Sequence, residues 1–314
     1  MKILLTGATG FVGREVVSAL QAQGHQVVAA VRSTAALPPG VEQRVVGDIS
    51  GPVAWAEALD GIDTVLHLAA RVHQMNDSAV DPLASFRAVN TEPTARLAQA
   101  AEAAGVKRFV FLSSIKVNGE STPLNPSQPF SVDSAPAPAD PYGSSKFEAE
   151  AALAAISASG AMKIATVRSP MVYGPEGRGN VQRLSNLARK GFPVPFGSIR
   201  NRRTMIAVQN LADLLVALCP AAPDTPPYSL VLAGDAHSPS TAELYRELAD
   251  ALGVPARILP FPVALLRLAG RLTGRAAEIA RLTESLEIRV GSTDPDFDWT
   301  PPLSFHEGIA RMAR

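Results

Sequence analysis

Short apolar runs alternate with amphipathic stretches through the first half of the chain. The apolar runs are typical of buried strands, and the amphipathic stretches have the period of helices packed on a sheet. The expected strands cover residues 3–5, 26–31, 64–68, 108–112 and 163–167. The expected helices cover residues 11–23, 53–59, 91–104 and 142–157. This alternation predicts an α/β protein with a doubly wound parallel sheet of the Rossmann type, covered by helices on both faces.

The character of the chain changes after Pro170. Beyond it, glycine and proline divide the sequence into shorter segments, most clearly over 171–196, and such residues interrupt regular elements. We therefore expect a dinucleotide-binding domain at 1–170, with later strands contributed from about 204–233. Residues 171–314 are expected to form mainly a smaller C-terminal lobe that binds the substrate.

Two segments depart from this pattern. Residues 121–141 are rich in proline and serine and are too long for an ordinary connection, so we expect a lid over a site. The apolar stretch 261–275 is interrupted by Arg267 and Arg271, which indicates a surface or partner-facing helix. A helix that lies on a membrane surface is the alternative interpretation.

Composition adds limits on partners and location. The 314 residues are 46% hydrophobic and 18% charged, which is typical of a globular protein and excludes a disordered chain. The 29 basic and 29 acidic residues balance, so no overall field draws the protein to nucleic acid, and an anionic ligand must be held locally. The single cysteine, Cys219, lies in an apolar stretch, where we expect it to be buried.

No targeting segment or metal site is evident. The chain starts directly in a strand pattern, without a charged leader, and no apolar run reaches the roughly 18 residues that span a bilayer. We therefore expect a cytoplasmic protein. His67 and His73 have no partner at a recognised ligand spacing, so no metal is expected.

A glycine loop follows the first strand and opens the first helix. Gly7, Gly10 and Gly13 are spaced by three residues. Gly7 would allow the tight turn, Gly10 the close approach of a phosphate, and Gly13 the packing of the helix on the sheet. Free amides and the helix dipole would bind the pyrophosphate of a dinucleotide. A tight turn without a ligand is the alternative.

The end of the second strand bears on the type of dinucleotide. A carboxylate at that point would accept hydrogen bonds from a ribose 2′-hydroxyl, but the sequence has Arg32. An arginine can pair with a 2′-phosphate, so NADP(H) is favoured. NAD(H) is possible, because Arg32 stacked over the adenine would suit either cofactor.

Three polar residues suggest the chemistry. Ser114 ends the fourth expected strand, and Tyr142 and Lys146 lie one turn apart on the next helix. A phenol is a poor proton donor or acceptor at neutral pH unless a nearby cation stabilises its anion, and Lys146 would supply that cation. Ser114 would hydrogen-bond the reacting oxygen while Tyr142 transfers the proton of a hydride-transfer reaction.

Several motifs occur together in one order along the chain. They are TGATGFVG, HLAA, FLSS, YGSSK and RSPMVYGP, at residues 6–13, 67–70, 111–114, 142–146 and 168–175. In this order and spacing, the whole chain resembles the extended short-chain dehydrogenases/reductases of the NAD-dependent epimerase/dehydratase family. The resemblance implies a nucleotide-sugar substrate, bound mainly by residues 171–314, and a homodimer.

The resemblance also implies roles for further residues. In the cofactor groove it implies Phe11, Val12, Asp48, Ile49, Leu68, Ala69, Ala70, Asn90 and Pro170, together with Tyr142 and Lys146. For the nucleotide diphosphate of the substrate it implies Asn180 and Arg203. Solvated loop residues are the alternative for these last two.

The surroundings of Ser114 bear on which sugar reaction is catalysed. Residues 114–118 lack the acidic pair of the family's dehydratases, so dehydration is disfavoured. Asn118 stands where the family commonly has tyrosine, which weakens the match to galactose 4-epimerases. Segments 113–120, 197–203 and 299–302 are instead similar to bacterial 4-ketoreductases of UDP-linked 6-deoxy-N-acetylhexosamines.

The leading hypothesis is therefore NADPH-dependent reduction of the C4 ketone of a UDP-4-keto-6-deoxy-hexosamine, for surface polysaccharide such as O-antigen. A UDP-sugar 4-epimerase with tightly bound NAD is the first alternative. The second is a dinucleotide-binding sensor or scaffold without catalysis.

Overall fold

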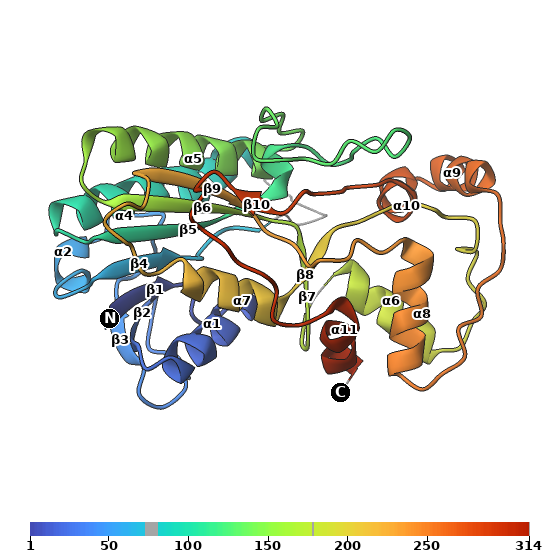
Figure 1. The fold of residues 1–314 in the computed structure, drawn as a ribbon, viewed down its shortest axis with the longest axis horizontal. Coiled ribbons are helices and arrows are strands. Elements are labelled where there is room, and N and C mark those ends of the chain that lie inside the picture. Colours follow the sequence, from blue (N-terminus) through green and yellow to red (C-terminus); the bar gives the residue numbers. More distant parts are fainter. Residues whose placement is uncertain (73–80, 178, 314) are drawn as a thin grey trace.

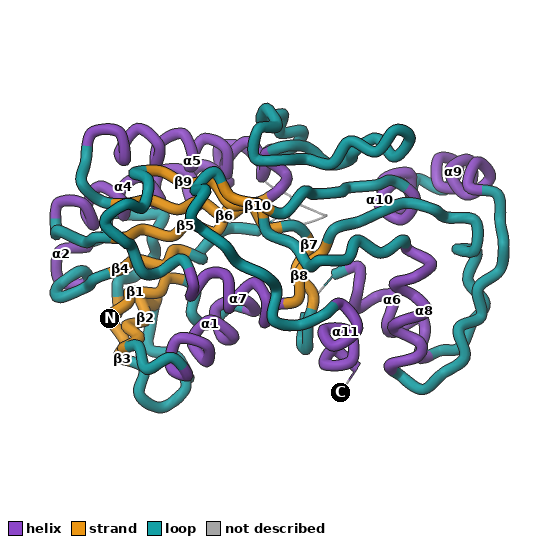
Figure 2. Tube along the Cα trace, viewed as in Figure 1, coloured by secondary structure: helices purple, strands orange, loops and turns teal. Residues whose placement is uncertain are grey.

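A single large sheet organises the N-terminal part of the molecule. In the computed structural model, which describes residues 1–72, 81–177 and 179–313, this sheet has eight strands (Figures 1 and 2). They are β1 (Lys2–Thr6), β2 (Gln26–Val31), β3 (Glu42–Val45), β4 (Thr64–His67), β5 (Arg108–Ser114), β6 (Lys163–Ser169), β9 (Tyr228–Leu232) and β10 (Gly291–Ser292). Their order is β3-β2-β1-β4-β5-β6-β9-β10, and neighbours are parallel except β9 and β10. The predicted Rossmann-type fold is confirmed.

Helices cover both faces of this sheet (Figure 1). One face packs against α1 (Phe11–Ala22) and α7 (Val208–Ala217), and the other against α2 (Trp55–Ala58), α4 (Glu92–Ala103) and α5 (Pro141–Ser159). Strand β5 is buried along almost its whole length, which explains its nearly continuous apolar sequence. Its C-terminal end leads into a short 3₁₀ turn, Ile115–Val117.

The helical region before α4 is longer than the sequence pattern predicts. It begins with α3 (Pro82–Phe86) and continues through a π-helical turn, Arg87–Thr91, into α4. Pro93 lies in the first turn of α4, where its missing N–H is not needed for an intrahelical bond. The π-helical turn therefore lets the chain pass from α3 to α4 without a break.

The C-terminal lobe has its own small core. It contains β7 (Met171–Tyr173), β8 (Met205–Ala207), α6 (Asn180–Arg189), α8 (Thr241–Ala251), α9 (Val263–Leu272), α10 (Ala276–Thr283) and α11 (Phe305–Ala313). Strands β7 and β8 pair in parallel, and apolar residues of α6, α8 and α11 pack around them. Within the described residues, no helix is both long and apolar enough to cross a membrane.

The topology predicts a ligand-binding crevice at one edge of the large sheet. From β1 the chain proceeds to β2 and β3 on one side, whereas β4, β5 and β6 follow on the other. Ligands of open α/β sheets bind where the strand order reverses, outside the carboxyl ends of the strands. Thr6, His67, Ser114 and Ser169 end four neighbouring strands at this edge.

The expected lid segment is joined to the C-terminal part of the chain. The Thr122 amide donates to the Ser285 carbonyl at 2.8 Å, and the Phe130 amide donates to the Glu287 carbonyl at 2.8 Å. The Phe130 carbonyl accepts from the Arg289 amide at 2.8 Å. The segment therefore lies along residues 285–289, beyond the N-terminal end of α5 (Figure 1).

Candidate active site

The glycine loop lies between β1 and α1. Gly7 has a φ of 76°, and a Cβ there would lie 2.9 Å from the Ala69 nitrogen. At Gly13 a Cβ would lie 2.0 Å from the Gly7 carbonyl oxygen. The fold itself therefore requires these two glycines, as the sequence predicts for a tight turn and close helix packing.

Gly10 has a different environment. It is exposed and extended, with a φ of −77°, and a Cβ there would meet only the Gly7 carbonyl oxygen, at 3.2 Å. As N-cap of α1 it offers no side-chain hydrogen bond, so the first-turn amides at Phe11 and Val12 have no side-chain cap. Because Gly10 has no side chain, a pyrophosphate group can approach the start of α1 closely. Its oxygens would accept hydrogen bonds from these amides.

The adenine end of the groove contains Arg32 and Asp48. Arg32 follows β2 directly and is exposed. The Asp48 carboxylate accepts from the Ser50 amide and hydroxyl, both at 2.9 Å, and these bonds, with a smaller effect of the Arg32 charge, lower the pKa of Asp48. Ile49 follows, half-buried. Arg32 thus lies near a carboxylate of the protein itself, so its position does not single out a 2′-phosphate.

The residues after β4 lie against the glycine loop. The Leu68 and Ala69 amides donate to the Thr6 hydroxyl at 3.2 and 3.1 Å, and Ala70 follows. This places the predicted groove residues 68–70 beside Gly7.

Asn90 is buried in the π-helical turn. Its side-chain oxygen accepts from the Arg71 amide at 2.8 Å, and its side-chain nitrogen donates to the Arg71 carbonyl and the Ser145 hydroxyl, both at 3.0 Å. Asn90 therefore joins the segment after β4 to α5, next to the groove that the family resemblance assigns to it.

The three predicted catalytic residues come together at the sheet edge. Ser114 ends β5, Tyr142 lies in the first turn of α5, and Lys146 follows one turn later. Ser114 lies near enough to the Tyr142 phenol to lower its pKa. The Tyr142 ring meets Phe86 of α3 edge-on, with ring centres 5.8 Å apart. Pro170, also buried, follows Ser169, whose strand register pairs it with Ser114.

Burial dominates the acid–base character of this site. It raises the pKa of Tyr142 to about 12, against the opposing effect of Ser114, and the Asp140 carboxylate raises this pKa further. Burial lowers the pKa of Lys146 to about 7, although the Glu150 charge opposes this. The Lys146 side-chain nitrogen donates to the Leu112 carbonyl at 2.9 Å. Both shifts favour the uncharged forms of the two groups, so stabilisation of the phenolate by Lys146 stays a prediction.

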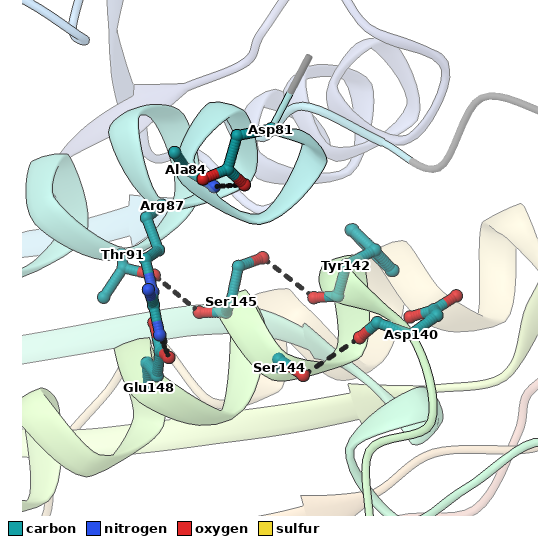
Figure 3. A network of polar contacts seen from close by, with 9 residues as sticks. All are labelled: Asp81, Ala84, Arg87, Thr91, Asp140, Tyr142, Ser144, Ser145 and Glu148. Atoms are coloured by element: carbon teal, nitrogen blue, oxygen red, sulfur yellow. Dashed lines mark hydrogen bonds and ion pairs between the residues drawn. The ribbon is translucent and has the colours of Figure 1, made fainter. Parts of the chain in front are cut away.

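A polar network fixes the turn of α5 that carries Tyr142 (Figure 3). Arg87 pairs with Glu148 at 2.5 Å, and the Thr91 hydroxyl donates to the Ser145 carbonyl at 2.9 Å. The Ser145 hydroxyl donates to the Tyr142 carbonyl at 2.8 Å. These contacts join the π-helical turn to α5, and Asp140 caps α5 by accepting from the Gly143 amide at 2.7 Å.

A buried ion pair behind the site was not predicted from the sequence. Arg168 of β6 pairs with Glu150 of α5 at 2.6 Å, and both side chains are only 5% exposed. Glu150 also accepts from the Ser113 hydroxyl at 2.5 Å, and Arg168 donates to the Asn118 side-chain oxygen at 3.0 Å. Tyr142, Lys146 and Glu150 recur every four residues of α5, and this spacing was the signal available in the sequence.

Asn118, the departure from the family pattern, belongs to this cluster. Its side-chain oxygen accepts from Arg168, and its side-chain nitrogen donates to the Ser134 carbonyl of the lid segment at 3.1 Å. It is 2% exposed. Asn118 therefore bonds within the protein rather than in the crevice, so it carries little information about which sugar reaction is catalysed.

Arg203 is a candidate anion-binding residue of the lobe. It is half-buried and donates to the Glu284 carbonyl at 3.0 Å. Burial lowers the pKa of Arg203, the Glu284 charge opposes this, and the Arg281 charge lowers the pKa again. A guanidinium group that has lost part of its water is stabilised by an added anion. Asn180, half-buried, starts α6 near β7.

A cavity of about 810 Å³ also lies in the lobe. Segments 200–202, 235–246 and 287–290 contribute its walls, which include the arginines Arg200, Arg202 and Arg246. None of Ser114, Tyr142, Lys146 and Arg203 lines it. The candidate active site is therefore the crevice at the sheet edge and not this cavity.

Other titratable residues have structural roles. His67 bonds with the hydroxyls of Thr6 at 2.7 Å and Thr94 at 2.9 Å, and burial lowers the pKa of His67 to about 3. Burial raises the pKa of the Cys219 thiol to about 12, which makes it unreactive. His73 lies outside the described residues, among which no group of three metal-ligating side chains occurs.

Comparisons with known proteins define the class. The family model for the NAD-dependent epimerase/dehydratase family matches residues 3–231, so the chain belongs to that family of short-chain dehydrogenase/reductase enzymes. It is 40% identical to a UDP-glucose 4-epimerase of Vibrio cholerae over 316 aligned residues, covering 99% of this chain and 94% of that protein.

Solved structures agree with this assignment. MoeE5 in complex with UDP-glucose and NAD superposes with a TM-score of 0.75 at 26% identity, covering 100% of this chain and 97% of that one. MoeE5 in complex with UDP-glucuronic acid and NAD gives a TM-score of 0.76 at 25% identity, covering 100% and 98%. The chain is thus similar over its full length to proteins that hold a UDP-sugar and NAD.

Proposed function

We propose that this protein is a UDP-sugar 4-epimerase that retains NAD. The observation that carries the proposal is the arrangement of Ser114, Tyr142 and Lys146 at the sheet edge, in a chain that matches a UDP-glucose 4-epimerase over nearly its whole length. The reductase hypothesis rests on the similarity of segments 113–120, 197–203 and 299–302 to 4-ketoreductases and on Arg32. Asn118, which weakened the match to galactose 4-epimerases, bonds with Arg168 and Ser134 inside the protein. We therefore favour the epimerase alternative.

The residues would act as follows. When bound, an oxidised dinucleotide supplies a hydride acceptor and a positive charge; the glycine loop, residues 68–70 and Pro170 would hold it. Ser114 would donate to the C4 oxygen of the sugar and orient it. Tyr142, as the phenolate, would take the proton of the C4 hydroxyl when C4 is oxidised and give it back when C4 is reduced. Lys146, anchored on the Leu112 carbonyl, would stabilise the phenolate before the first transfer and after the second. Arg203 would help to hold the diphosphate.

NADPH-dependent reduction of a 4-keto sugar is the second candidate. It is favoured by one observation, the absence of a carboxylate directly after β2, where the chain has Arg32. A dinucleotide-binding scaffold is less well supported, because both Tyr142 and Lys146 are present. Cytoplasmic location, a homodimer and a role in surface polysaccharide or O-antigen synthesis stay predictions.

Net consumption of cofactor distinguishes the two reactions. We expect the purified protein to interconvert UDP-glucose and UDP-galactose without added cofactor and to release NAD on denaturation, measured by chromatography and mass spectrometry. An epimerase returns the hydride, so the absorbance of reduced nicotinamide should not change in proportion to product. The reductase would be supported instead if NADPH were consumed in proportion to a UDP-4-keto sugar and if UDP-glucose and UDP-galactose were not interconverted.

The anion site predicts a selective effect on substrate binding. Arg203→Ala should raise KM roughly 10- to 100-fold with little change in kcat, because charged hydrogen bonds to a diphosphate act in ground and transition states alike. UDP should also raise the melting temperature of the wild type and not that of the variant. The control is Arg202→Ala, since the neighbouring Arg202 pairs with Glu287 and lines the other cavity. Equal effects of both substitutions would contradict the assignment.

A further inference from the structure

Helix α9 exposes an apolar face at the end of the molecule farthest from the large sheet (Figure 1). Leu265, Leu268 and Leu272 are 50%, 51% and 79% exposed, and their spacing puts them on one side of the helix. We call these three residues the leucine face. Phe261, just before α9, is exposed as well. An exposed apolar stripe of this kind marks an interaction surface.

The opposite side of α9 is already used for packing. Val263 and Leu266 pack against the core of the lobe. Gly270 is buried, and a Cβ there would lie 2.7 Å from a side-chain carbon of Ile279 in α10. The leucine face therefore cannot turn inward without giving up these contacts.

The charge around the leucine face indicates what covers it. From residue 251 to residue 277 the chain has four arginines, Arg257, Arg267, Arg271 and Arg275, and no aspartate or glutamate. The whole protein is neutral, so this positive charge is a local feature. Arg271 belongs to the last turn of α9, and Arg275 follows it by one turn. An apolar face flanked by arginines is typical of helices that lie in the interface of an anionic bilayer.

We propose that the leucine face of α9 docks this enzyme on the surface of an anionic phospholipid bilayer. The leucines would enter the interface between headgroups and acyl chains, and the arginines would pair with lipid phosphates. A second copy of the chain is a poorer partner, because a two-fold contact through this face would set arginines against arginines. The proposal concerns location and does not depend on which reaction the enzyme catalyses.

Vesicle binding tests the proposal. The wild type should float with vesicles of phosphatidylcholine and phosphatidylglycerol, and bind much less to vesicles of phosphatidylcholine alone. Leu265→Asp/Leu268→Asp should lower the partition coefficient at least roughly tenfold, since apolar burial is replaced by charge. Arg271→Glu/Arg275→Glu should lower it by at least roughly fivefold for each arginine removed.

Matched controls separate this effect from misfolding and from catalysis. Val45→Asp changes a similarly exposed apolar residue that lies outside the leucine face, 61% exposed on the edge strand β3. This variant should bind vesicles as well as the wild type does. UDP-sugar turnover in solution should be the same in all variants. The proposal is overturned if the wild type does not bind anionic vesicles, or if the leucine variant binds as well as the wild type. It is also overturned if ultracentrifugation shows a dimer that Leu268→Asp dissociates.

Discussion

Replacing Tyr142 with phenylalanine should lower kcat by about 10²- to 10⁴-fold, the usual contribution of a positioned proton donor. The change removes only the hydroxyl that Ser114 contacts. The ring keeps its edge-on packing against Phe86 at 5.8 Å, so substrate binding and folding should be retained. Steady-state kinetics with the epimerisation substrates measures the effect, and an unchanged melting temperature shows that the fold is intact.

A second tyrosine provides the control. Tyr228 of β9 is half-buried and donates its hydroxyl to Thr166 at 3.1 Å, away from the predicted site. Tyr228→Phe makes the same chemical change and should leave kcat within about threefold of the wild type. If Tyr142→Phe retained similar activity, the proton would have to be moved by another group, and the catalytic assignment would be wrong.

The pKa values of the protein alone sharpen this expectation. With the pKa of Tyr142 raised to about 12, the neutral phenol dominates near neutral pH, and with the pKa of Lys146 lowered to about 7, only part of the Lys146 side chains carry a charge there. The same burial that excludes water from the site disfavours the phenolate. Formation of the Tyr142 phenolate thus needs more positive charge than Lys146 alone provides. A bound oxidised dinucleotide would supply that charge, so we expect proton transfer only when the cofactor is bound.

The sequence predicts the buried strands well, and it predicts that Ser114, Tyr142 and Lys146 lie at one edge of the sheet, because both depend on local pattern. Strand β3 was missed, since its residues, Glu42–Val45, lie at the sheet edge and carry no apolar run. The expected helix began only at residue 91, so the sequence pattern missed α3 and most of the π-helical turn, Arg87–Thr91. In an open parallel sheet, the order of strands and helices along the chain is enough to place residues that end a strand or start a helix at the same edge of the sheet.

Long-range polar contacts could not be predicted in this way. Arg203 meets the Glu284 carbonyl only because the lobe folds, and no sequence motif links these two residues. Asn118 seemed informative about chemistry by comparison with a family pattern. Its actual role follows from Ser134 and Arg168, residues whose approach depends on tertiary structure.

Breaking the buried ion pair should have the largest effect on stability. Arg168→Met would leave the Glu150 carboxylate 5% exposed and without its cation, which costs about 3–5 kcal/mol in the free energy of unfolding. For a chain of this size the melting temperature should fall by roughly 5–15 °C. Thermal and urea unfolding measure the change.

A double-mutant cycle shows whether the unpaired charge causes the loss. Arg168→Met/Glu150→Leu removes both charges, so it should recover most of the stability lost in Arg168→Met alone. Arg87→Met serves as the matched control: its partner Glu148 lies two residues from Glu150 on α5, but this pair is solvent-exposed and screened. Its loss should hardly change the melting temperature. If the double variant is no more stable than Arg168→Met, the hydrogen bonds to Ser113 and Asn118, rather than charge compensation, hold β5, β6 and α5 together behind Tyr142.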